Sequence, residues 1–133
     1  GEPGATVAGL KLAFTTVLTM RGTPLVYYGD EIAIAGGPDP DNRRDFPGGW
    51  PADARNAFEA SGRTAEQQDV WTHVNSLLTL RATHADLRRA PMEHLVVTDQ
   101  QFVFRRGAVT VAINNDTVAT TVSMPSERPG RAA

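Results

Sequence analysis

The sequence contains no cysteine and carries almost no net charge. Without cysteine there is no disulfide framework, thiol nucleophile or cysteine metal site. The 13 lysines and arginines stand against 15 aspartates and glutamates, which gives a formal charge of −2 at pH 7. Such a balanced chain creates no field that would attract nucleic acid or an anionic membrane. We therefore expect neither nucleic acid nor a membrane among its partners.

Long apolar runs are also missing. The longest apolar stretch, residues 7–20, is interrupted by Lys11 and three threonines, whereas a membrane-spanning helix needs about 20 mainly apolar residues. Residues 1–4 have neither the basic region nor the apolar core of a secretory signal, and the start at Gly1 instead of methionine suggests a cut end. The cellular compartment stays undetermined.

The apolar content, 41% of 133 residues, is sufficient for a folded core. The length fits one domain of ordinary size or pieces of two, because a typical domain has about 100–200 residues. The length also excludes a complete eightfold β/α barrel, which needs about 200 residues or more.

The beginning of the chain has the pattern of an α/β fold. Apolar residues recur mostly at three- and four-residue steps over residues 5–20, which predicts a helix with a wide buried face. Gly22 and Pro24 then end this helix. The following run, residues 25–28, lacks polar alternation and predicts a strand covered on both faces, as in a parallel sheet. A helix, a tight turn and a buried strand together indicate an α/β fold.

A long loop and a second helix follow. Residues 30–63 are rich in Gly, Pro, Asp, Asn and Arg, and a loop of this length is either functional or disordered. Three aromatic residues predict that this loop folds around a small apolar cluster: Phe46, Trp50 and Phe58. Residues 64–67 match a capping box, which predicts a helix over residues 64–83.

After Pro91 the apolar period changes from about 3.6 to about 2 residues. The alternation predicts four short antiparallel strands, at residues 94–98, 101–105, 109–114 and 117–123. Antiparallel strands in sequence differ in kind from the α/β pattern before them. We therefore expect a domain boundary near residues 86–92.

The densest polar cluster lies in the long loop, at residues 39–45. Asp39 and Arg43 can present a carboxylate acceptor and a planar five-donor fork to one ligand, an arrangement that suits hydroxyl-rich molecules such as sugars. The alternative is that the charges of this cluster pair with one another and only shape the loop. The sequence leaves both interpretations open.

Metal sites have little support in the sequence. Asp39 and Asp41 occupy the first and third positions of a calcium-binding EF-hand loop, but Arg44 replaces the required glycine and Trp50 stands where the bidentate glutamate belongs. The three histidines lack the spacing of metal ligands: His73, His84 and His94. We expect no metal ligand and no cofactor in this segment.

Further candidates flank the predicted strand at residues 25–28. Asp30 and Glu31 follow it, where barrels and doubly wound sheets place functional groups, but adjacent residues point to opposite faces. One of them can face a site while the other serves the structure. Tyr28 and Trp50 can stack on a sugar ring, and filling the core under the loop is an equal alternative.

Two motifs together carry a family resemblance. The run from Arg21 to Ile32, RGTPLVYYGDEI, followed by GGPDPDNRR at residues 36–44, closely resembles the α-amylase superfamily of glycoside hydrolases (family 13) around the eighth strand of its catalytic barrel. The maltodextrin-acting branch, with cyclomaltodextrinases and neopullulanases, is nearest. The resemblance implies that residues 1–88 are the closing portion of a TIM (β/α)8 barrel and that residues 89–133 begin an antiparallel β-sandwich domain.

The same resemblance implies retaining hydrolysis of α-glucosidic bonds in starch and maltodextrins, which uses two carboxyl groups. In this family the catalytic acids belong to the fourth, fifth and seventh barrel strands, upstream of Gly1. We therefore expect no catalytic residue in this chain and no activity of the segment alone. The resemblance implies that Asp39 and Arg43 hold glucose units, with Tyr28 and Arg44 of the surrounding motif beside them. The expected partner is an α-glucan oligosaccharide.

Other functions stay open. A transglycosylase of the same superfamily shares the covalent intermediate and differs only in the acceptor that resolves it. A non-catalytic accessory relative would keep the barrel without the acids, and a free-standing sugar-binding module is a third possibility. Calcium dependence and oligomeric state are not encoded in these residues.

Overall fold

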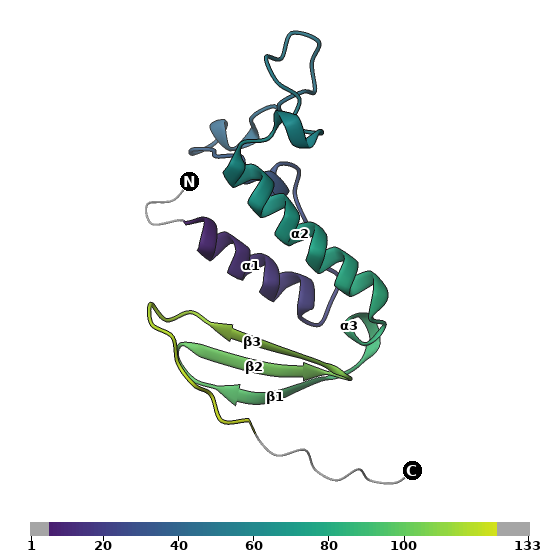
Figure 1. Cartoon of the computed structure of the whole chain (residues 1–133), viewed down its shortest axis with the longest axis vertical. Coiled ribbons are helices and arrows are strands. Elements are labelled where there is room, and N and C mark those ends of the chain that lie inside the picture. The colour runs from purple at the N-terminus through teal and green to yellow at the C-terminus, as the bar shows by residue number, and fades with distance from the viewer. Residues whose placement is uncertain (1–5, 125–133) are drawn as a thin grey trace. The chain divides into compact units, whose positions relative to one another are not determined.

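A computed structural model describes residues 6–124 of the chain. The contacts divide the chain into two units between Thr83 and His84. The first unit contains two long helices, α1 (Val7–Thr19) and α2 (Ala65–Thr83), joined by a long loop (Figure 1). The second unit contains a short helix and a three-stranded sheet. Within residues 6–124, neither long helix is apolar enough over a sufficient length to cross a membrane.

Helix α1 confirms the prediction for the first apolar stretch. Thr6 caps its start, because the hydroxyl accepts a hydrogen bond from the Gly9 N–H at 3.0 Å. The helix ends at Thr19, and Gly22 follows with a φ of 118°, a left-handed value that favours glycine.

Helix α2 begins with the predicted capping box. The Thr64 hydroxyl accepts a hydrogen bond from the Gln67 N–H at 3.2 Å, and the Gln67 side-chain oxygen accepts one from the Thr64 N–H at 3.0 Å. These reciprocal bonds satisfy backbone donors that have no partner inside the helix.

The two helices run side by side in the same direction and share the core of the first unit (Figure 1). Its central residues are almost fully buried: Phe14, Leu18, Val70 and Val74. Burying one such side chain contributes about 1.5–3 kcal/mol, so this seam holds the helix pair together.

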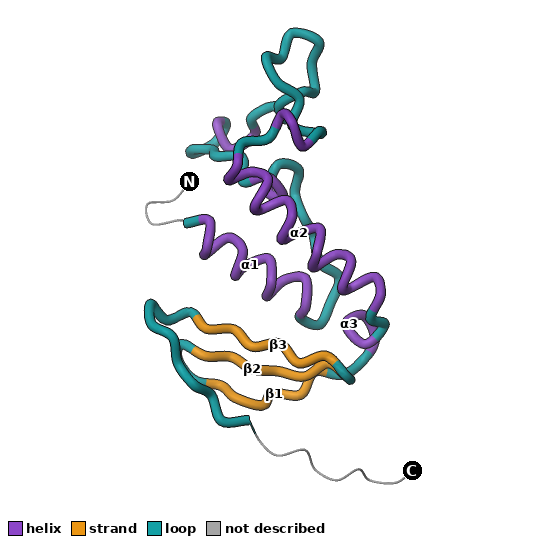
Figure 2. Tube along the Cα trace, in the orientation of Figure 1, coloured by secondary structure: helices purple, strands orange, loops and turns teal. Residues whose placement is uncertain are grey.

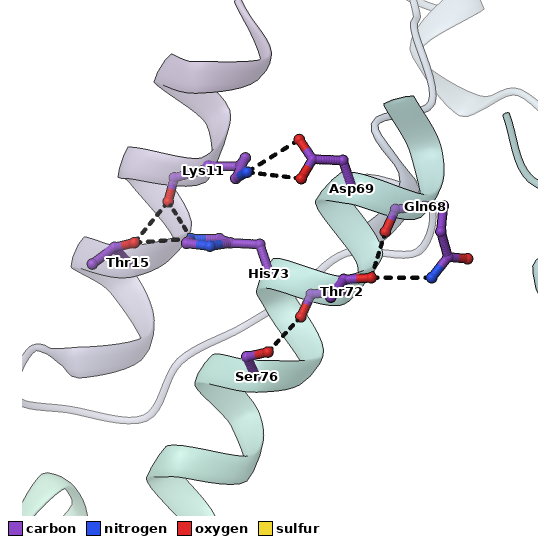
Figure 3. A network of polar contacts seen from close by, with 7 residues as sticks. All are labelled: Lys11, Thr15, Gln68, Asp69, Thr72, His73 and Ser76. Atoms are coloured by element: carbon purple, nitrogen blue, oxygen red, sulfur yellow. Dashed lines mark hydrogen bonds and ion pairs between the residues drawn. The ribbon is translucent and has the colours of Figure 1, made fainter. Parts of the chain in front are cut away.

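Polar contacts accompany this apolar seam at successive levels (Figure 3). Lys11 forms an ion pair with Asp69 at 2.9 Å. One turn further along, the His73 ring nitrogen Nε2 lies 3.0 Å from the Thr15 hydroxyl and 3.0 Å from the Lys11 carbonyl. His73 is therefore a helix-packing residue, as expected for a histidine without metal-ligand spacing.

Residues 25–28 are not a strand in this structure, which corrects the sequence prediction. They have no regular secondary structure, and a turn begins at Tyr28. The physical reason is that a strand is defined by hydrogen bonds to a neighbouring strand. Within the first unit, the described residues supply no partner strand for this run.

The segment between the two long helices is otherwise loop with three short 3₁₀ turns: η1 (Asp30–Ile32), η2 (Asp41–Arg43) and η3 (Ala60–Gly62). Figure 2 shows that the part between η2 and η3 projects beyond the start of α2. The polar cluster and the three predicted aromatic residues all lie in this long loop.

The second unit consists of α3 (Asp86–Arg89) and an antiparallel sheet in the order β1-β2-β3. The strands are β1 (Met92–Val97), β2 (Gln101–Arg106) and β3 (Val109–Asn114). In the register Phe104 lies opposite His94 on one side and Val111 on the other. The buried apolar side chains of this unit come from α3 and from the sheet: Leu87, Val103, Phe104, Val111 and Ile113. Three of the four predicted strands are thus confirmed.

The fourth predicted strand, at residues 117–123, is wrong, because this part of the described chain contains no strand. After β3 the Asn115 N–H donates to the Gln100 carbonyl at 2.8 Å. The Asn114 side chain donates to the Val118 carbonyl at 2.9 Å. These bonds hold the chain beside the β1–β2 turn instead of returning it along the edge of β3.

Candidate functional site

The turn η2 brings the two leading sequence candidates together. The Asp41 N–H donates to the Pro38 carbonyl at 2.8 Å, and the Arg43 N–H donates to the Pro40 carbonyl at 3.1 Å. This turn places Asp39 and Arg43 on one side of the loop, where the Arg43 guanidinium donates to the Asp39 carboxylate. Their side chains are 67% and 60% exposed, so both remain accessible to a ligand.

A second ion pair holds this loop in shape. The Arg44 guanidinium donates to both oxygens of the Asp41 carboxylate, and Asp41 Oδ2 also accepts the Gly37 N–H at 2.8 Å. The hydrogen bonds from Arg44 lower the pKa of Asp41, and the same contact raises the pKa of Arg44. A Cβ at position 37 would lie 2.8 Å from Asp41 Oδ2, so a larger residue there would displace the Asp41 carboxylate from its bond to the backbone.

The structure is compatible with both interpretations of the polar cluster, as a ligand-binding site and as charges that shape the loop. The charges do pair within the loop, as the structural alternative required. The two ion pairs differ in their further contacts. The Asp41 side chain also accepts a hydrogen bond from the Gly37 N–H, whereas the side chains of Asp39 and Arg43 contact only each other among the described contacts.

Tyr28 lies at the end of the segment at residues 25–28. Its ring packs against Tyr27 with the centroids 4.6 Å apart, and 46% of the residue is exposed. Partial shielding from water and the neighbouring Tyr27 raise the pKa of the Tyr28 hydroxyl; the charge of Asp45 adds to this rise, and the charge of Arg43 opposes it. The hydroxyl thus lies within the fields of two loop residues.

Asp30 and Glu31 have separate roles. The Glu31 carboxylate accepts the Gly29 N–H at 2.7 Å and fixes the turn after Tyr28, where Gly29 has a φ of 90°. Asp30 is exposed and lies at the edge of a hollow of about 180 Å³ that is otherwise lined by apolar side chains: Leu10, Ala13, Phe14, Val17 and Leu25. Glu31 therefore serves the structure, and Asp30 remains accessible.

Two larger hollows lie beside the polar cluster. One has a volume of about 380 Å³ and is lined by residues from both sides of the loop and from the start of α2: Ala33, Ile34, Ala35, Arg44, Asp45, Pro47, Arg55, Thr64, Glu66 and Gln67. The other has a volume of about 280 Å³ and is lined by Asp45, Phe46, Pro47, Asp53, Ala54 and Arg55. The two hollows share Asp45, Pro47 and Arg55.

The aromatic residues of the loop only partly form the predicted cluster. Phe46 and Phe58 pack with their centroids 4.4 Å apart, but Trp50 is 62% exposed and does not fill the core. The loop is instead held by Arg63. Its guanidinium donates to the Ala57 and Phe58 carbonyls at 2.8 Å and lies 4.3 Å from the ring centroid of Trp71 in α2.

Of the residues singled out in the sequence, Asp39 and Arg43 form an ion pair, Arg44 pairs with Asp41, and Tyr28 lies close enough for the charge of Arg43 to act on the pKa of its hydroxyl. Arg55 and Asp53 were not singled out, because no motif marks them and only the folded loop brings them next to Asp45. Among residues 6–124, no three His, Asp or Glu side chains are grouped so that they could hold a metal ion.

The chain is similar in sequence and in structure to several known enzymes. The chain is 30% identical over 134 residues to the cyclomaltodextrinase of Geobacillus thermopakistaniensis, which covers 96% of this chain and 21% of that protein. It is 37% identical over 79 residues to the maltogenic α-amylase of Bacillus acidopullulyticus, 59% of this chain and 11% of that protein. The crystal structure of a debranching enzyme from Nostoc punctiforme matches with a TM-score of 0.67 and 32% identity, over 86% of this chain and 21% of that one.

These relatives are much longer than the chain described here. The chain spans about a fifth of the length of the cyclomaltodextrinase and of the debranching enzyme. No family model matches the sequence.

Proposed function

The chain belongs to the α-amylase superfamily of glycoside hydrolases, and from this membership we propose that it supplies substrate-binding residues to an enzyme that hydrolyses α-glucosidic bonds of starch and maltodextrins. In this proposal Asp39 and Arg43 bind glucose units, Tyr28 lies beside them, and Arg44 completes the loop. The reaction proceeds with retention, through a covalent glycosyl intermediate.

One observation carries this proposal: Asp39 and Arg43 form an exposed pair on a turn that the Asp41–Arg44 pair holds in place. A carboxylate accepts hydrogen bonds from sugar hydroxyls, and a guanidinium donates several in one plane. Because the loop is already ordered, a ligand loses less free energy to loop ordering when it binds.

The arrangement of the first unit supports a place in a β/α barrel. Helices α1 and α2 run in the same direction, and the chain between them must return past the seam before α2 can begin (Figure 1). In βαβ units such a return is made by a strand, and residues 25–28 occupy that part of the path. Leu25 and Val17 are 78% and 45% exposed, an apolar surface that neighbouring strands and helices of a barrel would cover.

We therefore assign residues 1–88 to the closing part of the barrel and residues 89–133 to the start of the C-terminal β-domain. Retaining catalysis needs a nucleophile and an acid/base with carboxyl groups about 5–5.5 Å apart. In the family these belong to other barrel strands, so none of the carboxylates in this chain is given a catalytic role. The segment alone is proposed to be inactive, while its loop residues bind and orient the sugar.

The proposal can be tested by calorimetry with maltotriose on the 133-residue chain. Arg43→Ala should weaken binding by about 1–3 kcal/mol, the contribution of charged hydrogen bonds. Arg89→Ala, an exposed arginine of the second unit, serves as the matched control and should bind as the wild type does. Equal affinities of wild type and Arg43→Ala, or no binding by the wild type, would contradict the binding role.

A second measurement tests the inactivity of the segment. The chain is incubated with maltooligosaccharides, and reducing sugar is measured against a blank without protein. We expect no increase. Saturable release of reducing sugar would show that the segment carries its own catalytic acids and would refute this part of the proposal.

A further inference from the structure

We propose that the loop carries a second α-glucan-binding site, separate from Asp39 and Arg43, in the two hollows that meet at Asp45 and Arg55. This inference rests on the proposed function for its class of ligand, an α-linked glucose oligosaccharide. It differs in location, because neither Asp39 nor Arg43 lines either hollow.

The shape of the site favours an oligosaccharide. The hollows have volumes of about 380 and 280 Å³, and they share Asp45, Pro47 and Arg55. The larger hollow falls within the range of about 300–1,000 Å³ that is typical of small-molecule pockets, and the smaller one lies just below this range. Two adjoining hollows of this size on either side of the same three residues can hold successive sugar units of one chain.

The charges favour a neutral ligand. The larger hollow is lined by two guanidinium groups, Arg44 and Arg55, and by two carboxylates, Asp45 and Glu66. Two positive and two negative groups leave the hollow without the excess of one charge that would select an anion or a cation. A polyhydroxylated molecule without charge has hydroxyls that can donate to the carboxylates and accept from the guanidinium groups.

Hydrogen-bonding capacity remains at the centre of the site. Arg55 uses its Nη1 group to donate to Gln67 at 3.2 Å, while a guanidinium has five N–H donors in total. Asp53 accepts two backbone N–H groups through Oδ2, from Gly48 and Trp50, and its Oδ1 makes no hydrogen bond within residues 6–124. Asp45 likewise has no hydrogen-bonding partner in this part of the chain.

Aromatic surface lies beside these polar groups. Phe46 lines the smaller hollow and packs on Phe58. Trp50 is 62% exposed although its backbone N–H is fixed by Asp53 at 3.1 Å. Asp53 Oδ2 thus fixes the backbone of the turn and leaves the Trp50 ring on the surface, next to the hollows but not in their lining. Phe46 is the aromatic group of the smaller hollow, and its ring can pack against the C–H groups of a sugar.

The loop that carries this surface is fixed against the rest of the first unit. Asn56 packs so closely on two glycines that a Cβ at Gly62 would lie 1.8 Å from its carbonyl oxygen and one at Gly48 would lie 2.7 Å from its Cα. Arg63 holds the following carbonyls of Ala57 and Phe58. The binding groups are thus arranged before a ligand arrives.

The test is an NMR titration of the isotope-labelled 133-residue chain with maltohexaose, with the β-linked cellohexaose as the control ligand. The Trp50 indole N–H and the Arg55 Nε–H report on the second site, and the Asn42 and Arg43 amides report on the first. Signals of Leu18 and Val74, which are buried in the core of the first unit, show whether each variant keeps its fold.

We expect Arg55→Ala to weaken binding at the second site by about tenfold or more, as for the loss of a charged hydrogen bond. The Asn42 response should be unchanged. Arg43→Ala should have the converse effect. Arg89→Ala should alter neither response. Arg55→Lys keeps the charge and the size of the side chain, and weaker binding by this variant would identify the planar fork as the binding group.

The outcomes separate the two proposals. If Asn42 responds to maltohexaose and Trp50 and Arg55 do not, the second site is refuted and the proposed function stands. If Trp50 and Arg55 respond and Asn42 does not, the second site stands and the binding role of Asp39 and Arg43 is refuted. Loss of both responses in Arg43→Ala, or equal binding of cellohexaose, would overturn the inference of a separate α-glucan site.

Discussion

Arg44 holds Asp41 through two parallel hydrogen bonds, from Nε to Oδ1 and from Nη2 to Oδ2, each 2.7 Å long. Asp41 also accepts the Gly37 N–H, so three hydrogen bonds from two residues close the loop between residues 37 and 44. Asp39 and Arg43 lie inside this closed segment. Their positions therefore depend on an ion pair that does not include them.

Asp41→Asn should weaken maltotriose binding without removing any of the proposed binding groups. The substitution keeps the size of the side chain but replaces one acceptor oxygen with a donor, which breaks the bidentate contact with Arg44. Because the pair is exposed, we expect an effect of up to about fivefold in Kd. Asp99→Asn, at an exposed turn of the second unit, is the control for calorimetry. Unchanged affinity would show that the loop keeps its shape without the pair.

The same pair predicts a pH dependence. The contact with Arg44 lowers the pKa of Asp41 in the folded chain, so the pair is complete above the ordinary aspartate value of about 3.9 and is lost as the pH falls through the lowered pKa. Carboxyl carbon chemical shifts followed from pH 6 to pH 2 should give Asp41 a midpoint below the ordinary value. In Arg44→Gln the midpoint should rise toward the ordinary value, and an unshifted midpoint in both proteins would contradict the contact.

The seam between the two long helices predicts where the first unit is most sensitive to substitution. Leu18 is fully buried, and Leu18→Ala should lower the free energy of unfolding by about 2–5 kcal/mol because it leaves a cavity. Leu78 on α2 is 44% exposed, so Leu78→Ala should change the free energy of unfolding by no more than about 0.5 kcal/mol. Urea unfolding followed by circular dichroism at 222 nm measures both. Equal losses would mean that the seam is not the core.

Gly62 is expected to be essential for the shape of the loop. A Cβ at this position would lie 1.8 Å from the Asn56 carbonyl oxygen, so Gly62→Ala forces the backbone apart. We expect a loss of about 1–3 kcal/mol, the usual cost of overpacking, together with shifted amide signals from Asn56 to Phe58. Ser61→Ala, at the exposed neighbouring position, is the control. An unperturbed spectrum for Gly62→Ala would refute the close approach.

Local patterns in the sequence were sufficient to predict the two long helices. The capping box at residues 64–67 and the apolar steps of residues 5–20 depend only on neighbours within two helical turns, and both helices are present. The two strand errors have a different cause. Residues 25–28 and 117–123 have the side-chain pattern of strands, but a strand also needs a backbone partner, which composition and alternation do not specify.

The candidate site likewise combines residues that a local motif brings together with residues that only the folded loop brings together. Asp39 and Arg43 are four residues apart on one turn, so a local motif is enough to bring them together. Arg55 reaches the site through a loop fold that also places it against Gln67, twelve residues further along the chain. The exposure of Trp50 was equally hidden, because an aromatic residue in a loop is compatible with both a core and a surface position until the turn is known.

The position of Arg63 has a consequence for cleavage of the chain. Its guanidinium is bound to two carbonyls of the loop and lies over Trp71, so trypsin can take this arginine into its specificity pocket only after the loop has separated from α2. Arg55 is an exposed arginine of the same loop and is tied to α2 by a single hydrogen bond, to Gln67, so its release needs less movement of the loop. The rate of cleavage after Arg63, compared with the rate after Arg55, therefore reports how often the loop separates from α2.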